Sequence, residues 1–235
     1  MNIKDKFKYL LFNPIKEIKD IKLINRKITM SIQLKYLTCE KIKTKSIRCI
    51  PYLCDDMSKK NKDRTYSKSS IKGKIKDDQR LGYLQLYYNK NPLLYVTTPV
   101  MKCLFGVQKY NNNFQMSLQF VNLKEDNEMK QFFEFIQNTE FECMKYLGLD
   151  EDDSDRFVSQ IKYDKQKKYD PNLSVKIPFH YNQFQTDIYS ENTPAVNLFN
   201  IQGFTPMQCD IYLDKIWKMN DKFYAKWKCK IIHLL

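Results

Sequence analysis

The stretch NDKFYAKWKCKII, residues 220–232, alternates between two kinds of side chain near the end of the 235-residue chain. One set is apolar and consists of Phe223, Ala225, Trp227, Cys229 and Ile231. The residues between them are Tyr224, Lys226, Lys228 and Lys230. Successive side chains of a β-strand point to opposite faces. The stretch therefore predicts a strand with one face in a core and a basic, aromatic face outside.

The residues before this stretch supply a partner strand. QCDIYLDKIW, residues 208–217, alternates in the same way, with Cys209, Ile211 and Leu213 on the face of Trp227 and Tyr212 on the outer face. The residues around Asn220-Asp221 are typical of a tight hairpin turn. The C-terminal part of the chain is therefore predicted to form a β-hairpin with lysines and tyrosines on its outer surface.

Other segments predict further strands. NFQMSLQFV, residues 113–121, gives the clearest alternation, with inward side chains Phe114, Met116, Leu118 and Phe120. VNLFNIQ, residues 196–202, is also predicted to be a strand. Gly106 within LFGVQKY, residues 104–110, predicts a bulge or a close backbone approach.

One segment has helical periodicity. Residues 125–149 carry an apolar stripe made of Met129, Phe132, Phe133, Ile136, Cys143 and Leu147. We expect a long amphipathic helix that begins at Asp126 or Asn127 and ends at Gly148, which suits a helix C-terminus.

About nine or ten strands in hairpins and one helix favour a mainly β, α+β fold, an antiparallel OB-like barrel or sandwich. We expect residues 1–45 to be a basic N-terminal extension and residues 46–235 to be the OB-like domain. Residues 55–80 are polar and rich in Lys and Ser, which predicts a flexible basic loop within that domain.

The net charge of +13 is confined to the first third of the chain. Residues 1–80 hold 22 Lys/Arg and 9 Asp/Glu, whereas the remaining residues hold 18 of each. Basic segments attract polyanions. An AT-rich genome also raises the Lys content without any binding function, so both explanations of the lysine excess stay open.

Several function classes find little support in the sequence. No apolar run reaches the roughly 18–20 residues of a membrane helix. The seven Cys form no CxxC pair, and His180 and His233 lack metal-ligand spacing to them. Phosphate-binding, dinucleotide-binding, zinc-protease and serine-hydrolase motifs are absent. We expect a soluble intracellular protein that is not an enzyme, has no metal or cofactor, and has no membrane partner.

Single-stranded nucleic acid is held by cations along its backbone and by flat rings under its bases. Side chains of both kinds lie on the outer faces of predicted strands, and the candidate nucleic-acid-binding residues are Tyr212, Tyr224, Lys226, Lys228, Lys230, Lys102, Lys109, Tyr110, Lys162 and Lys176. An ordinary edge strand also carries lysines, because they block aggregation. Both interpretations of the C-terminal hairpin stay open.

Three segments resemble one protein family. They are LLYVTTPVMKCLFGV (93–107), FVSQIKYDKQKKYDPNLSVKIPF (157–179) and DIYLDKIWKMNDKFYAKWKCKII (210–232). In this order, and with the predicted helix between the first two, they are similar to the OB-fold single-stranded-DNA-binding proteins of nucleocytoplasmic large DNA viruses, relatives of a phage-type protein. The resemblance covers about residues 84–232.

The resemblance implies coating of single-stranded DNA during viral DNA replication without base specificity. Partners would be single-stranded DNA, with RNA left open, and replication proteins; the location would be the host cytoplasm or a viral replication compartment. Phage-type members recruit partners through an acidic tail, whereas this sequence ends in IIHLL. The alternative is a structural or virion interaction protein with a β-sandwich fold. The oligomeric state is left open.

Overall fold

The computed structural model describes residues 37–54, 64–68, 81–111, 113–150, 152–190 and 197–235. All of these residues belong to one unit, residues 37–235. Most of the predicted extension over 1–45 and of the predicted loop over 55–80 therefore lies outside the described residues. Both assignments stay predictions.

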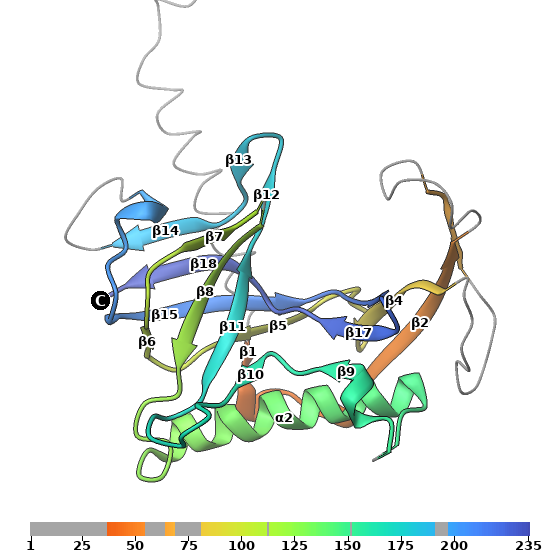
Figure 1. The fold of residues 1–235 in the computed structure, drawn as a ribbon, viewed down its shortest axis with the longest axis horizontal. Coiled ribbons are helices and arrows are strands. Elements are labelled where there is room, and N and C mark those ends of the chain that lie inside the picture. The colour runs from red at the N-terminus through yellow and green to blue at the C-terminus, as the bar shows by residue number, and fades with distance from the viewer. Residues whose placement is uncertain (1–36, 55–63, 69–80, 112, 151, 191–196) are drawn as a thin grey trace, which may run out of the picture. The chain divides into compact units, whose positions relative to one another are not determined.

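Five strands close into a barrel (Figure 1). In order around it they are β6 (Met101–Cys103), β8 (Asn113–Gln119), β11 (Asn172–Ile177), β18 (Lys228–Leu234) and β15 (Thr205–Leu213), which pairs with β6 again. Numbered along the chain, this order is first, second, third, fifth and fourth, a Greek-key arrangement. Of these five pairings, the one between β11 and β18 is parallel and the others are antiparallel. The predicted OB-like barrel is confirmed.

Short strands extend the sheet of the barrel. Their pairings are β1 (Leu37–Thr38) with β5 (Leu94–Thr97), β5 with β15, β14 (Asp187–Ser190) with β18, β7 (Gln108–Tyr110) with β8, and β10 (Ile161–Lys162) with β11. β12 (Phe179–His180) and β13 (Gln183–Phe184) form a separate two-stranded sheet. Tyr110 at the end of β7 pairs with Asn113 at the start of β8, so these two strands form a hairpin.

A second large sheet has six strands. Their order is β3 (Tyr66–Lys68), β2 (Ile47–Cys54), β4 (Leu81–Tyr88), β16 (Lys215–Met219), β17 (Lys222–Ala225) and β9 (Phe157–Val158). β2 and β3 are strands that the sequence did not predict. β2 contains Pro51 and lacks a regular alternation of buried and exposed residues, and β3 lies within the predicted loop.

The predicted C-terminal hairpin serves both sheets. β16 and β17 pair across the turn at Asn220 and Asp221, whose φ angles are 49° and 57°. On the other side of Asp214 and Trp227, the same two chain segments pair as β15 and β18 in the barrel. The predicted hairpin is therefore confirmed, and its first half changes partners along its length: β16 pairs with β4 in the second sheet, whereas β15 pairs with β5 and β6 in the barrel.

The predicted inward face of the C-terminal stretch is confirmed. Phe223, Ala225, Trp227 and Cys229 are at most 2% exposed. The predicted partners on β15, Cys209, Ile211 and Leu213, are equally buried. The apolar alternation therefore continues through the point where the chain passes from one sheet to the other.

The helix α2 (Asn127–Leu147) lies across one end of the barrel (Figure 1). The Asp126 side chain accepts a hydrogen bond from the Met129 amide, and Gly148 ends the helix in the left-handed conformation, as predicted. Among the described residues, no helix combines the length and the apolarity needed to cross a membrane.

Aromatic rings join α2 to the barrel. The ring centroids of Phe120 and Phe132 lie 6.0 Å apart, those of Phe132 and Phe135 6.2 Å, and those of Phe135 and Trp227 6.1 Å. Phe135 is buried although the predicted stripe omitted it, and Phe133 is half-buried against Phe120. Such ring pairs add about 0.5–1.5 kcal/mol each beyond the area they bury.

Within the described residues, four short 3₁₀ helices connect the strands: η3 (Cys39–Lys41), η4 (Thr44–Ser46), η6 (Ser154–Arg156) and η7 (Leu198–Asn200). The predicted strand over 196–202 is wrong, because η7 occupies its centre. The Asn197 side chain accepts a hydrogen bond from the Phe199 amide at 3.0 Å. This local bond favours a helical turn over an extended strand.

The close backbone approach predicted at Gly106 is confirmed. Gly106 has a φ of 66°, and a Cβ atom placed on it would collide with the carbonyl oxygen of Ile201. Two requirements, a positive φ and the lack of a side chain, therefore act at one position.

We expect Gly106→Ala to lower the free energy of unfolding by about 2 kcal/mol or more, because strain and collision add. Urea denaturation measures this loss. Gly148→Ala is the control, since Gly148 also has a positive φ (70°) but lies at a helix end. That variant should lose only about 1 kcal/mol. Equal losses would contradict the role of the Ile201 contact.

Candidate nucleic-acid interface

The outer surface of the barrel carries a line of polar and aromatic side chains. Residues that pair directly across neighbouring strands lie on the same face of a sheet. The pairs from β5 to β7 define the barrel row, which consists of Tyr95, Tyr212, Lys228, Lys176, Gln115 and Gln108. Three residues predicted from the sequence, Tyr212, Lys228 and Lys176, are thereby brought into one line.

A surface pocket of about 230 Å³ opens beside the barrel row. It is lined by Tyr110, Asn111, Asn113, Phe114, Gln115, Gln160, Ser174, Lys176 and Lys226. Pockets that enclose small molecules usually exceed about 300 Å³ and are mostly apolar. This smaller, polar and cationic pocket suits one polar group of a longer ligand.

Positive charge is concentrated beside this pocket. The pKa of Lys176 is lowered by burial and by the positive charges of Lys228 and Lys226, while Asp214 acts in the opposite direction. The Lys228 ammonium lies 2.7 Å from the Asp214 carboxylate, which offsets part of the charge of Lys228. An anion placed beside Lys176 and Lys226 would relieve the remaining repulsion.

Tyr212 packs within the barrel row. Its ring centroid lies 5.9 Å from that of Tyr95, and the Lys228 ammonium lies 5.7 Å from the Tyr212 ring centroid. Burial, followed by the Asp214 charge, raises the pKa of the Tyr212 hydroxyl to about 12. Both Tyr95 and Lys228 contact this half-buried ring. Tyr212 therefore packs against Lys228 and does not present an open ring face on which a base could stack.

Other predicted residues lie around the pocket. Lys226 lines the pocket, and its ammonium lies 5.5 Å from the Tyr224 ring centroid. Tyr110 is 52% exposed and donates a hydrogen bond to Gln108 at 3.0 Å. Lys109 pairs with the inward-facing Phe114 and therefore lies on the other face of β7 from Tyr110.

Three predicted lysines lie away from the pocket. Lys102 and Lys162 lie in a second line at the other end of β8 and β11. The strands pair Lys102 with Gln119, Gln119 with Asn172, and Asn172 with Lys162. Lys162 also donates to the Ser159 carbonyl at 2.7 Å.

The third, Lys230, lies at an irregularity in the pairing of β15 with β18. The register shifts between Asp210 and Ile211, so their partners, Ile231 and Cys229, are separated by Lys230. Its ammonium lies 3.8 Å from the Asp187 carboxylate and 3.4 Å from the Gln185 carbonyl. Lys230 is therefore held at the edge of the barrel near β14.

The second sheet carries an aromatic surface that the sequence did not predict. The strand pairs Tyr52–Tyr83, Tyr83–Trp217 and Trp217–Tyr224 place four rings on one face, which we call the aromatic row. Of these, Tyr224 alone was a predicted site residue. The sequence contains one signal of this face, because YLQLYY, residues 83–88, alternates Leu84 and Leu86 with Tyr83, Gln85 and Tyr87. The pairing of β4 with β2 and β16, which brings the other rings beside Tyr83, was not predicted.

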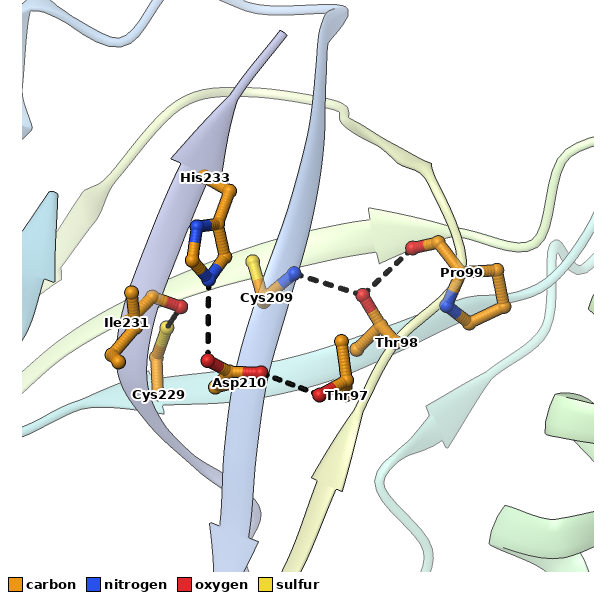
Figure 2. A network of polar contacts seen from close by, with 8 residues as sticks. All are labelled: Thr97, Thr98, Pro99, Cys209, Asp210, Cys229, Ile231 and His233. Atoms are coloured by element: carbon orange, nitrogen blue, oxygen red, sulfur yellow. Dashed lines mark hydrogen bonds and ion pairs between the residues drawn. The ribbon is translucent and has the colours of Figure 1, made fainter. Parts of the chain in front are cut away.

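Figure 2 shows a polar network that joins β5, β15 and β18. Thr97 donates to Asp210 at 2.6 Å, His233 Nε2 lies 3.2 Å from Asp210, and Thr98 accepts from the Cys209 amide at 3.0 Å. The carboxylate contacts the hydroxyl, whereas in a nucleophilic triad the imidazole does. The network therefore ties strands together, and the absence of enzymatic activity stays a prediction.

No group of His, Cys, Asp and Glu among the described residues is arranged to hold a metal ion.

We expect Lys226→Gln to raise the pKa of Lys176, because one repelling charge is removed. Asp214→Asn should lower that pKa further. An NMR titration of the lysine side chains measures both shifts. Lys109→Gln is the matched control and should leave the Lys176 pKa unchanged, since Lys109 lies on the opposite face of β7 from the pocket-lining Tyr110. A shift of the same size in that variant would contradict the local cluster.

No protein-family model matches the sequence. No curated protein matches it either. Among solved structures, the chain is similar to "Single-stranded DNA-binding protein from bacteriophage Enc34 in complex with ssDNA", with a TM-score of 0.43 and 8% sequence identity. That match covers 66% of this chain and 90% of the phage chain. The family resemblance of the sequence stays a prediction, and a binding function has to rest on the side chains of this chain.

Proposed function

We propose that the chain binds single-stranded nucleic acid on the outer face of β8 and β11, without base specificity. The observation that carries this proposal is the convergence of Lys176, Lys226 and Lys228 beside a polar pocket. Its position supports the proposal as well. OB-folds hold oligonucleotides on their second and third strands and on the loops after the first and before the fifth. Here Tyr110 follows the first barrel strand and Lys226 precedes the fifth.

The chemistry of the pocket suits a nucleic-acid strand. Phosphates would bind Lys176 and Lys226, where an anion relieves the repulsion between lysines. The exposed ring of Tyr110 offers a stacking surface, and stacking contributes about 1–3 kcal/mol per base. The amide and hydroxyl groups of Gln115 and Ser174 can bond to phosphates or base edges. Only an unpaired strand has free base faces for such stacking.

We extend the proposal to the setting that the sequence resemblance implies. The chain would coat single-stranded DNA during viral DNA replication, together with replication proteins, in the host cytoplasm or a viral replication compartment. RNA would also fit the pocket, because lysine contacts to phosphates do not distinguish a 2′-hydroxyl.

We expect an oligo-dT strand longer than one OB-fold site of about 4–16 nucleotides to bind in fluorescence anisotropy. Duplex DNA should bind more weakly, and affinity should fall with salt. The double variant Lys176→Gln/Lys226→Gln should lose at least about tenfold, since each charged hydrogen bond contributes on the order of 1.5 kcal/mol. For each phosphate that the variant no longer binds, the slope of log affinity against log salt should become shallower by about 0.7.

The matched control is Lys130→Gln/Lys145→Gln, which removes the same charge from the exposed side of α2. Its affinity should stay close to that of the unmodified protein. Equal losses in both double variants would mean that net charge alone drives binding. No binding at low salt would overturn the proposal and favour the alternative of a protein that uses its outer faces for protein contacts.

The lowered pKa of Lys176 makes binding pH-dependent. A bound phosphate raises this pKa, so affinity is fully present below the pKa of the free protein and decreases as the pH rises through it. We expect affinity to decrease at a pH below the ordinary lysine value of about 10.4. Lys176→Arg keeps its charge over this range and should bind at higher pH than the unmodified protein does. Identical pH profiles would contradict the involvement of Lys176.

A further inference from the structure

The aromatic row forms a continuous surface on the second sheet. The rings of Tyr52 and Tyr83 are stacked with centroids 4.9 Å apart and an interplanar angle of 7°. Those of Tyr83 and Trp217 lie 5.0 Å apart. Neighbouring strands are about 4.8 Å apart, so the row from Tyr52 to Tyr224 extends over roughly 14 Å.

Cations lie over these rings. The Lys215 ammonium lies 4.4 Å from the Tyr83 ring centroid and 5.5 Å from that of Trp217. Lys68 pairs with Tyr52 and so lies at the outer end of the same row. The row thus combines flat rings with positive charges, and the exposed ring among the four is that of Trp217.

The row meets the barrel pocket at one side chain. Lys226 lines the pocket and lies 5.5 Å from the ring centroid of Tyr224, the last member of the row. A strand whose phosphate lies at Lys226 would therefore be next to Tyr224, with Trp217 on the neighbouring strand.

A purely structural explanation accounts for only part of this arrangement. Cross-strand aromatic pairs stabilise sheets, and Tyr66 packs edge-on against both Tyr83 and Trp217. Gly82 leaves room for the Tyr66 ring, with which a Cβ atom there would collide. Trp217 is nevertheless 38% exposed, so part of its ring is open to a ligand.

We propose that the aromatic row is a second tract of the nucleic-acid surface, which stacks bases of a strand whose phosphates are held at the barrel pocket. This inference rests on the proposed function. It implies that a short strand occupies the pocket alone, whereas a longer strand reaches the row through Lys226 and Tyr224.

Tryptophan fluorescence tests this inference directly. The chain has 2 Trp, of which Trp227 is fully buried, so Trp217 is the exposed reporter. We expect a long oligo-dT to quench the fluorescence, because a base stacks on the indole. A strand near the lower limit of about 4 nucleotides should bind in anisotropy without quenching. Trp217→Phe keeps an aromatic ring and should abolish the quenching.

A second variant tests how much the aromatic row contributes to the affinity for the long strand. Tyr52→Leu/Trp217→Leu should weaken binding of the long strand about tenfold or more and leave the short strand unaffected. Unchanged short-strand affinity also shows that the barrel is folded. Phe141→Leu, at a 54% exposed ring on α2, is the matched control and should change neither affinity.

The outcomes separate the two proposals. If both strands bind but the long strand neither quenches Trp217 nor is weakened by Tyr52→Leu/Trp217→Leu, the second tract is overturned and the pocket proposal stands. If neither strand binds, the proposed function fails and the second tract with it. If the long strand quenches Trp217 and Lys176→Gln/Lys226→Gln has no effect, the row is the binding surface and the pocket is not.

Discussion

Burial of Trp227 fixes the orientation of the chain at the candidate site. Its side chain is fully buried and lies 6.1 Å, centroid to centroid, from Phe135 on α2. Its carbonyl accepts a hydrogen bond from the Lys176 amide at 2.8 Å. Since extended residues alternate in direction, an inward Trp227 forces Lys226 and Lys228 outward. Trp227 therefore positions all three lysines. Lys226 and Lys228 are its neighbours in the sequence, and the Lys176 amide is hydrogen-bonded to its carbonyl.

Trp227 also marks the point where the chain passes from the second sheet to the barrel. β17 ends at Ala225 and β18 begins at Lys228. Lys226 thus lies between the sheets, which explains how one side chain lies beside both Tyr224 and the pocket. The barrel row and the aromatic row meet here because a single chain segment supplies strands to both.

The sequence predicted what local alternation determines. It identified the inward faces of β8, β15 and β18, both ends of α2 and the turn at Asn220-Asp221. It did not predict pairings between distant segments, because register across such distances depends on the whole sheet. For that reason Tyr52, Tyr83 and Trp217 were missed. Lys109 lies on the opposite face of β7 from Tyr110, and Lys230, which does alternate correctly, lies at the edge of the barrel near β14. The register shift between β15 and β18 leaves Lys230 as an extra residue on β18, and the alternation of the sequence does not reveal this shift.

The surroundings of Lys176 bear on the two explanations of the lysine content, a binding function and the composition of an AT-rich genome. A lysine added by genome composition would be expected on a solvated surface, where it costs little. Lys176 is instead half-buried beside two other lysines, and its pKa is lowered by burial first and by their charges next. A lysine that binds its proton less tightly in the folded state than in the unfolded state destabilises the fold at neutral pH, and this cost disappears only as the pH rises past the lysine range. Packing gives no reason to keep a charge at this position, since an apolar or neutral side chain would avoid the cost. Binding an anion does give one, because a phosphate beside the lysines would offset their mutual repulsion, which after burial is the next cause of the lowered pKa of Lys176.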